Sequence, residues 1–264
     1  KPEVHGKEFA MMTWEDFTDE EFFLCPPLIC VGGDGAMLDI GFQNLSRMLA
    51  SGLPIRVVVL DTQVYSNTGG QACTSGFTGQ ISDMAMFGDG QQGKTETRKE
   101  MSLLAMAHRN SFVLQSSQAT ASHLIGGVLR GLQTRRPAIF VLNTPCPVEH
   151  GTADDSAVRQ SKMALEGRAL PNLEYNPDEG DCIADHLSLD GNPAVEEDWP
   201  TYSLNYLNED GEEASMDLPF TVADWAITEG RFGKHFRPLS DGDDGVVFHE
   251  YLALSTEDRE GQTP

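Results

Sequence analysis

Two short apolar runs, each followed by a stretch rich in glycine and oxygen-bearing side chains, constrain the fold of this 264-residue chain most strongly. The runs are residues 28–31 and 55–60, and their length and composition predict buried parallel strands. The stretches that follow are residues 32–35 and 61–71. Because open α/β sheets bind ligands beyond the carboxyl ends of their strands, both stretches are expected at a ligand-binding edge.

The side chains of these two stretches favour a site for a metal ion and a phosphate group. Asp34 supplies a carboxylate and Thr62 a hydroxyl, next to spare backbone carbonyls. These are hard oxygen donors, which Mg²⁺ prefers when it also carries phosphate. Glycines at 32, 33 and 35 let the backbone approach a bound group closely. We therefore expect a Mg²⁺–diphosphate site.

Each stretch also has an ordinary structural interpretation. Asp34 is a suitable N-cap for a helix that begins near Ala36, and Asn67-Thr68-Gly69 is a suitable turn. For either stretch alone, this interpretation is as good as the functional one. The two stretches together, with Thr62 lying 62 − 34 = 28 residues after Asp34, favour the ligand site.

Gly33-Asp34-Gly35, followed by Asp61-Thr62-x-x-Tyr65-Ser66-Asn67-Thr68-Gly69-Gly70-Gln71, resembles the thiamine diphosphate domain of the pyruvate:ferredoxin (flavodoxin) oxidoreductases, within the 2-oxoacid oxidoreductase family. The resemblance extends from about residue 28 to about residue 177. It implies that Asp34, the Thr62 side chain and the Val64 carbonyl bind Mg²⁺. It further implies a catalytic role for Asn67, over the diphosphate and toward the 2-oxoacid. The residues expected to line the cofactor are Gly33, Asp34, Gly35, Ala36, Thr62, Gln63, Val64, Tyr65, Ser66 and Asn67.

The same resemblance implies an iron–sulfur ligand at Cys146, which follows a predicted strand over residues 138–143. In the family a cysteine at this point binds the 4Fe–4S cluster nearest the thiamine ring. The family's other cluster cysteines lie upstream of Gly-Asp-Gly, and residues 1–27 hold no comparable set. The cluster is therefore expected to be shared with residues outside this sequence. The alternative is that Cys146 is a buried packing residue.

The alternation of expected strands and helices predicts an α/β protein with a doubly wound, mostly parallel sheet, followed by an irregular acidic C-terminal extension. The resemblance implies that this sheet is the thiamine diphosphate-binding fold. Three segments are expected: a lead-in (1–27), the cofactor-binding domain (28–177) and the extension (178–264). Within the extension, the acidic run to Asp217 is interpreted as loops. The expected elements are helices at 37–49, 97–108, 119–132 and 156–165, and strands at 28–31, 55–60, 111–115 and 138–143.

Charge and composition exclude several classes of partner. The net charge is −23, and residues 174–264 hold 23 acidic and 4 basic residues, a net of 4 − 23 = −19. Such a tail repels phosphate backbones, so we expect no nucleic-acid partner. No apolar run approaches 18 residues, so we expect no membrane span. The five cysteines form no Cys-x-x-Cys pair, which indicates a reducing, cytoplasmic location. A start at Lys1 suggests a fragment or a processed chain.

The resemblance implies the thiamine diphosphate- and Mg²⁺-binding portion of a 2-oxoacid:ferredoxin or flavodoxin oxidoreductase, with pyruvate as the leading substrate and acyl-coenzyme A as product. Its expected partners are the remaining domains or subunits of that enzyme, within a homo-oligomer, and the chain alone is not expected to be active. Ala36 replaces the family's usual large aromatic residue, which leaves a bulkier 2-oxoacid open. Two alternatives remain: a non-catalytic assembly module, and a non-oxidative thiamine diphosphate-dependent decarboxylase in which Cys146 has no role.

Overall fold

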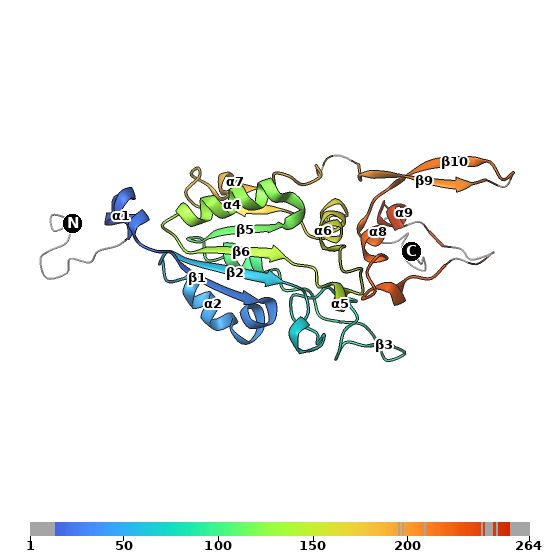
Figure 1. Ribbon diagram of the computed structural model, residues 1–264, viewed down its shortest axis with the longest axis horizontal. Coiled ribbons are helices and arrows are strands. Elements are labelled where there is room, and N and C mark those ends of the chain that lie inside the picture. The colour runs from blue at the N-terminus through green and yellow to red at the C-terminus, as the bar shows by residue number, and fades with distance from the viewer. Residues whose placement is uncertain are drawn as a thin grey trace, which may run out of the picture.

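The computed structural model describes residues 14–194, 196, 198–208, 210–238, 240, 245–246 and 248–253, so residues 1–13 of the predicted lead-in lie outside it. A six-stranded sheet forms its centre, in the order β1-β2-β6-β5-β7-β8 (Figure 1). The strands β1, β2, β6 and β5 are parallel, β7 is antiparallel to β5, and β8 is antiparallel to β7. The strands of this sheet are β1 (Leu28–Gly33), β2 (Ile55–Asp61), β5 (Phe112–Ser117), β6 (Ala138–Asn143), β7 (Leu173–Tyr175) and β8 (Leu187–Ser188). The predicted α/β class with a mostly parallel sheet is confirmed.

Helices connect these strands and cover both faces of the sheet (Figure 1). The α-helices are α1 (Asp19–Leu24), α2 (Phe42–Leu49), α3 (Met101–Met106), α4 (Ala121–Gln133), α5 (Pro147–His150), α6 (Ala157–Glu166), α7 (Ile183–His186), α8 (Val222–Ala226) and α9 (Phe248–Ala253). A π-helix, η2 (Gly35–Ile40), precedes α2. Short 3-10 turns are η1 (Trp14–Asp16), η3 (Ser66–Thr68), η4 (Gln118–Thr120) and η5 (Gly233–His235).

The sheet packs an apolar core on each face, as a doubly wound sheet requires. On one face, α2 and α3 pack against alternate residues of the central strands, and this core includes Leu45, Val57, Met101 and Ile139. On the other face, α4 covers Phe112, Leu114 and Phe140, among others. At 25 cal/mol per Å² of buried apolar surface, each fully buried leucine or phenylalanine contributes about 1.5–3 kcal/mol to folding.

The register of the parallel strands brings the predicted site residues to one edge. Gly33, the last residue of β1, pairs with Leu60, and Asp61, the last residue of β2, pairs with Asn143 at the end of β6. Because these strands end together, the loops that begin at Asp34 and Thr62 lie side by side. The carboxyl ends of the strands therefore form the candidate ligand-binding edge.

The structure corrects the predicted helices on either side of this edge. The helix predicted over 37–49 begins as the π-helix η2 and continues as α2 after Gly41. A Cβ at position 41 would lie 2.2 Å from the Ala36 carbonyl oxygen, so only glycine fits this wide turn. The helix predicted over 97–108 is limited to α3, Met101–Met106, because Arg98 and Lys99 make tertiary contacts instead.

Part of the C-terminal extension is also more regular than predicted. The loops expected up to Asp217 are wrong for β9 (Thr201–Leu207) and β10 (Glu213–Pro219), which form an antiparallel hairpin at one end of the molecule (Figure 1). Apolar side chains pair across its strands, as Tyr202 with Leu218 and Leu204 with Met216 do. This period-two pattern is present in the sequence, but the surrounding acidic residues obscured it. A second small hairpin joins β3 (Phe87–Gly88) and β4 (Gln91–Gln92).

A third apolar cluster attaches the extension to the domain. Trp225 and Phe232 pack with Ala164 of α6, and Phe77 from the long loop after β2 lies against them. This cluster lies beyond the carboxyl ends of the strands, where α8 is found (Figure 1). Within the described parts of the chain, no helix is both long enough and apolar enough to cross a membrane.

Candidate functional site

Asp34 is the buried carboxylate that joins the two loops, and its side chain is 4% exposed. Its Oδ1 accepts a hydrogen bond from the Gly35 amide at 2.8 Å, so it does cap the helix that follows. Its Oδ2 accepts from the Val64 amide at 3.2 Å and from Ser75 Oγ at 3.1 Å. Burial and the nearby Asp61 raise the pKa of Asp34 above its ordinary value. The N-cap and the ligand-site interpretations therefore apply to the same side chain.

Three oxygens from the predicted metal ligands converge. Thr62 Oγ1 lies 3.2 Å from Asp34 Oδ2 and 2.8 Å from the Val64 carbonyl oxygen. A single hydroxyl proton cannot satisfy both acceptors. Adjacent ligands of an octahedral Mg²⁺ with bonds of 2.0–2.1 Å lie about 2.9 Å apart. The donor set therefore fits a magnesium ion in both chemistry and spacing.

A carboxylate-rich metal cage is not part of this arrangement. No group of three or more His, Cys, Asp or Glu side chains placed to hold a metal occurs within the described ranges. Mg²⁺ usually binds through one or two carboxylates together with phosphate oxygens. The Asp34–Thr62–Val64 set is of that kind, and it leaves further coordination positions to a ligand.

Gln63 has a strained backbone between the two metal-ligand candidates. Its φ is +63°, in the left-handed region that favours glycine. Its amide donates to Asp61 Oδ1 at 3.2 Å, and its Nε2 donates to Asn143 Oδ1 at 3.0 Å. The Gln63 side chain is fully buried, so only the backbone of this residue is available to a ligand at the site.

Tyr65 and Gly35 pack the second loop directly on the first. A Cβ at Gly35 would lie 1.8 Å from Tyr65 Cε1, so the position admits only glycine. The Tyr65 hydroxyl donates to Asp39 Oδ2 at 2.6 Å, and Ser66 Oγ donates to Thr62 Oγ1 at 2.9 Å. Burial and the Asp39 carboxylate raise the pKa of Tyr65 well above its ordinary value.

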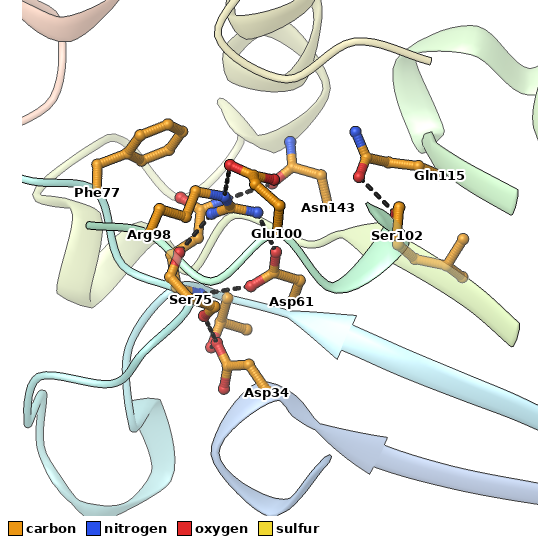
Figure 2. A network of polar contacts seen from close by, with 12 residues as sticks. Asp34, Asp61, Ser75, Phe77, Arg98, Glu100, Ser102, Gln115 and Asn143 are labelled. Carbon is orange, nitrogen blue, oxygen red and sulfur yellow. Dashed lines mark hydrogen bonds and ion pairs between the residues drawn. The ribbon is translucent and has the colours of Figure 1, made fainter. Parts of the chain in front are cut away.

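Arg98, which the sequence analysis did not identify, lies within the network of polar contacts at the site (Figure 2). Arg98 Nη2 donates to Asp61 Oδ2 at 2.7 Å, and the two side chains are 7% and 3% exposed. Arg98 also donates to the Ser75 carbonyl and pairs with Glu100 at 3.1 Å. Burial lowers the pKa of Arg98, but Asp61 and Glu100 raise it to a net value above normal. Arg98 therefore links the β2 end to the loop whose Ser75 binds Asp34 (Figure 2).

The other predicted cofactor-lining residues are open to solvent. Gly33, Ala36 and Asn67 are exposed, and Asn67 lies in the turn η3. The Asn67 side chain makes no hydrogen bond to another residue of the described ranges, so it is available to a ligand. The nearby thiol of Cys73 is buried, and burial together with Asp34 raises its pKa to about 12.

Cys146 lies where the sequence predicted it, directly after β6 and before α5. Its side chain is half-buried and its thiol is unpaired. The Thr144 amide donates to the Asp61 carbonyl at 2.9 Å, which fixes this segment to the same edge as Thr62. Two histidines outside the site make structural hydrogen bonds: His108 bonds Ser46, and His123 bonds Ser116.

Comparison with known proteins finds a family model that matches part of the chain. Residues 24–141 match the family described as thiamine pyrophosphate enzyme, C-terminal TPP binding domain. Pyruvate:ferredoxin oxidoreductase of Moorella thermoacetica is 36% identical over 148 residues, 56% of this chain and 12% of that protein. Pyruvate-flavodoxin oxidoreductase of Trichormus variabilis is 32% identical over 178 residues, 67% of this chain and 14% of that protein.

A shorter relative is a single subunit. Pyruvate synthase subunit PorB of Thermotoga maritima is 32% identical over 146 residues, 55% of this chain and 45% of that subunit. Among solved structures, 2-oxoglutarate:ferredoxin oxidoreductase from Magnetococcus marinus aligns with a TM-score of 0.42 and 18% identity, over 49% of this chain and 43% of that one. The chain thus spans less than half the length of these relatives. The sequence resemblance to the thiamine diphosphate domain of these oxidoreductases is confirmed.

Proposed function

We propose that this chain, whose residues 24–141 match the thiamine pyrophosphate-binding domain, supplies the thiamine diphosphate- and Mg²⁺-binding portion of a 2-oxoacid:ferredoxin or flavodoxin oxidoreductase. The observation that carries the proposal is the convergence of Asp34 Oδ2, Thr62 Oγ1 and the Val64 carbonyl oxygen. The relatives named as pyruvate oxidoreductases support pyruvate as the 2-oxoacid. Acyl-coenzyme A as the product is part of the proposal.

In this proposal the three oxygens would hold Mg²⁺, which would offset the charge of the cofactor's diphosphate. Thiamine diphosphate supplies the carbanion chemistry that 2-oxoacid decarboxylation requires. Gly33 is exposed and leaves room for the diphosphate, whereas Gly35 lets Tyr65 close against the first loop. Asp39 holds the Tyr65 hydroxyl and so keeps that ring in place.

Asn67 is proposed as the catalytic residue that this chain contributes. Its exposed side chain is free to donate from its amide to the diphosphate or to the substrate carboxylate. Ala36 is exposed in η2, and its small side chain allows a 2-oxoacid larger than pyruvate. Substrate identity thus depends on residues 36 and 67 and on the partner domain.

Cys146 is proposed as one thiolate ligand of a 4Fe–4S cluster, which would supply one-electron transfer when bound. A thiolate is the protein ligand that such clusters require, and Cys146 lies on the edge that holds Thr62. The remaining ligands, the coenzyme A site and the docking site for ferredoxin or flavodoxin belong to the remaining domains or subunits, in a homo-oligomeric enzyme. The five unpaired cysteines support a cytoplasmic location.

Steady-state assays of the complete enzyme test this function. We expect pyruvate- and coenzyme A-dependent reduction of ferredoxin or flavodoxin that requires Mg²⁺ and thiamine diphosphate. Release of free aldehyde without reduction of an electron carrier would support the non-oxidative decarboxylase instead. Intact cofactor binding with neither activity, on pyruvate or on larger 2-oxoacids, would support the assembly module. The variant Asn67→Ala separates catalysis from metal binding, because it is expected to lower activity and leave Mg²⁺ binding unchanged.

A further inference from the structure

We propose that the C-terminal segment takes part in the cofactor site, because Glu229 and Arg231 position the Thr62–Gln63 backbone through His150 and Gln80. We call these four side chains the support network. The inference rests on the proposed function and deepens it, since the network acts on the loop that carries two of the three metal ligands. The matched family domain ends at residue 141, so three of the four residues lie outside it.

The inner pair of the support network holds two backbone carbonyls. His150 Nε2 lies 2.8 Å from the Thr62 carbonyl oxygen, and because a carbonyl only accepts, Nε2 carries the hydrogen. Gln80 Nε2 donates to the Gln63 carbonyl at 2.9 Å. Consecutive carbonyls of the metal-binding loop are therefore each held by a buried side chain.

The outer pair fixes the inner pair. Arg231 Nε donates to Glu229 Oε2 at 2.6 Å, and Arg231 Nη1 donates to Gln80 Oε1 at 3.1 Å. Glu229 Oε2 lies 3.7 Å from His150 Nδ1, too far for a hydrogen bond, and the link to His150 is the Arg231 amide, which donates to the His150 carbonyl at 3.4 Å. Trp225 Nε1 donates to Glu229 Oε1 at 3.2 Å and so orients the carboxylate from its other side.

The charges of the outer pair are fully removed from solvent. Glu229 is 1% exposed and Arg231 is 3% exposed. A buried ion pair gains little net stability over apolar residues of the same volume, because desolvation opposes the attraction. Their use here is better explained by geometry: a fixed guanidinium holds Gln80, and a fixed carboxylate faces His150.

The loop needs this support because Gln63 is strained. A φ of +63° is uncommon for residues other than glycine and persists only where the surroundings fix the backbone. The Thr62 side chain and the Val64 carbonyl, on either side of Gln63, are the candidate metal ligands. If Gln63 relaxed, the two oxygens would separate.

The C-terminal segment around Gly230 packs directly against the domain through backbone contacts. A Cβ added at Gly151 would lie 2.9 Å from Gly230 Cα, so the backbones at these two glycines are in contact. The Ile81 amide donates to the Arg231 carbonyl at 2.9 Å. In Figure 1 the segment after α8 lies beside α5, beyond the strand ends.

Hydrogen exchange in the full chain without ligand tests the positioning role. The variant is Gln80→Leu, and the control is Gln160→Leu, because Gln160 is also buried and bonds Thr228 of the same segment but not the loop. We expect the amides of residues 62–65 to exchange about tenfold faster in Gln80→Leu, which is what one net hydrogen bond represents. The control is expected to leave these amides unchanged.

A second variant tests the outer pair without leaving a buried charge unpaired. Glu229→Gln combined with Arg231→Met removes both charges and keeps similar volumes. We expect the same increase in exchange, confined to residues 62–65. Unchanged loop exchange in both variants would overturn the proposal. So would an increase of equal size in β5 and β6, because it would show general support of the domain.

Cofactor titrations of the assembled enzyme connect the network to the metal. We expect Gln80→Leu to raise the Mg²⁺ concentration for half-maximal thiamine diphosphate binding about tenfold, and excess Mg²⁺ to restore binding. Faster loop exchange with an unchanged Mg²⁺ requirement would overturn the link to the metal site. If the parent enzyme bound no thiamine diphosphate at all, the proposed function would fail, while the exchange experiment would still decide the positioning role.

Discussion

Two buried carboxylates of the site are predicted to respond differently to the same Asp→Asn change. Asp61 pairs with Arg98 at 2.7 Å, and both side chains are buried. Removing one partner of a buried ion pair costs about 3–5 kcal/mol, because the other charge is left uncompensated. We expect Asp61→Asn to lower the unfolding free energy of the ligand-free chain by about 3 kcal/mol. At about 2–4 °C per kcal/mol, its Tm falls by about 6–12 °C.

Asp34→Asn should leave the stability of the ligand-free chain nearly unchanged and reduce the stabilisation that bound ligand provides. Among the described residues no cation pairs with Asp34, whose partners are the neutral donors of Gly35, Val64, Ser75, Thr62 and Cys73. An asparagine loses one acceptor, at about 1–3 kcal/mol, but also removes a desolvated carboxylate. We expect these effects to offset to within about 1 kcal/mol.

The ligand-dependent stabilisation is the part that Asp34→Asn is expected to remove. A ligand at 100 times its Kd stabilises the folded state by about 2.7 kcal/mol. Thermal unfolding of the full chain without ligand, and Mg²⁺-dependent cofactor binding in the assembled enzyme, separate the two variants. Should Asp34→Asn destabilise the ligand-free chain as much as Asp61→Asn and still bind cofactor normally, Asp34 is a helix cap and the metal assignment is wrong.

Three further changes test separate parts of the site. Gly35→Ala forces the Tyr65 ring to move, so cofactor affinity should fall about tenfold or more in titrations, while Gly88→Ala, with open space around its Cβ, should have no effect. Burial raises the pKa of Glu229, but the Arg231 guanidinium lowers it to a net value below 4.5. Its stabilising contribution is therefore present above pH 4.5 and lost below it, so acid should destabilise the parent more steeply than Glu229→Gln in urea titrations at each pH. Cys146→Ser in the anaerobic holoenzyme should alter or remove one 4Fe–4S signal in electron paramagnetic resonance; unchanged clusters and carrier reduction would make Cys146 a packing residue.

The strands of the central sheet were predictable because their signal is local. The strand over 138–143 has the bounds that the sequence indicated, since an apolar run between Pro137 and Thr144 determines both ends. The capping box of Thr18 and Glu21 likewise marks the start of α1. Where tertiary contacts decide the structure, as at the π-helix after Asp34, local patterns did not suffice.

The candidate site was predictable only in part, for the same reason. Asp34 and Thr62 stand in short stretches whose spacing is recognisable, and the structure brings them together. Arg98, Glu229 and Arg231 carry no local motif, because their roles depend on contacts across up to 151 residues of chain. For Glu229 and Arg231, the local sequence shows only charged residues between the aromatic residues Trp225 and Phe232.

Asp34, Thr62 and Val64 are predicted to bind thiamine diphosphate through Mg²⁺. Calorimetric titration of thiamine diphosphate into the assembled enzyme, with Mg²⁺ and after chelation of divalent cations, tests it most directly. We predict saturable binding with Mg²⁺ and at least about a hundredfold weaker binding without it, because the cation offsets the charge between diphosphate and Asp34. Equal affinity in the two titrations, or no binding in either, would show that these three residues do not bind thiamine diphosphate through Mg²⁺.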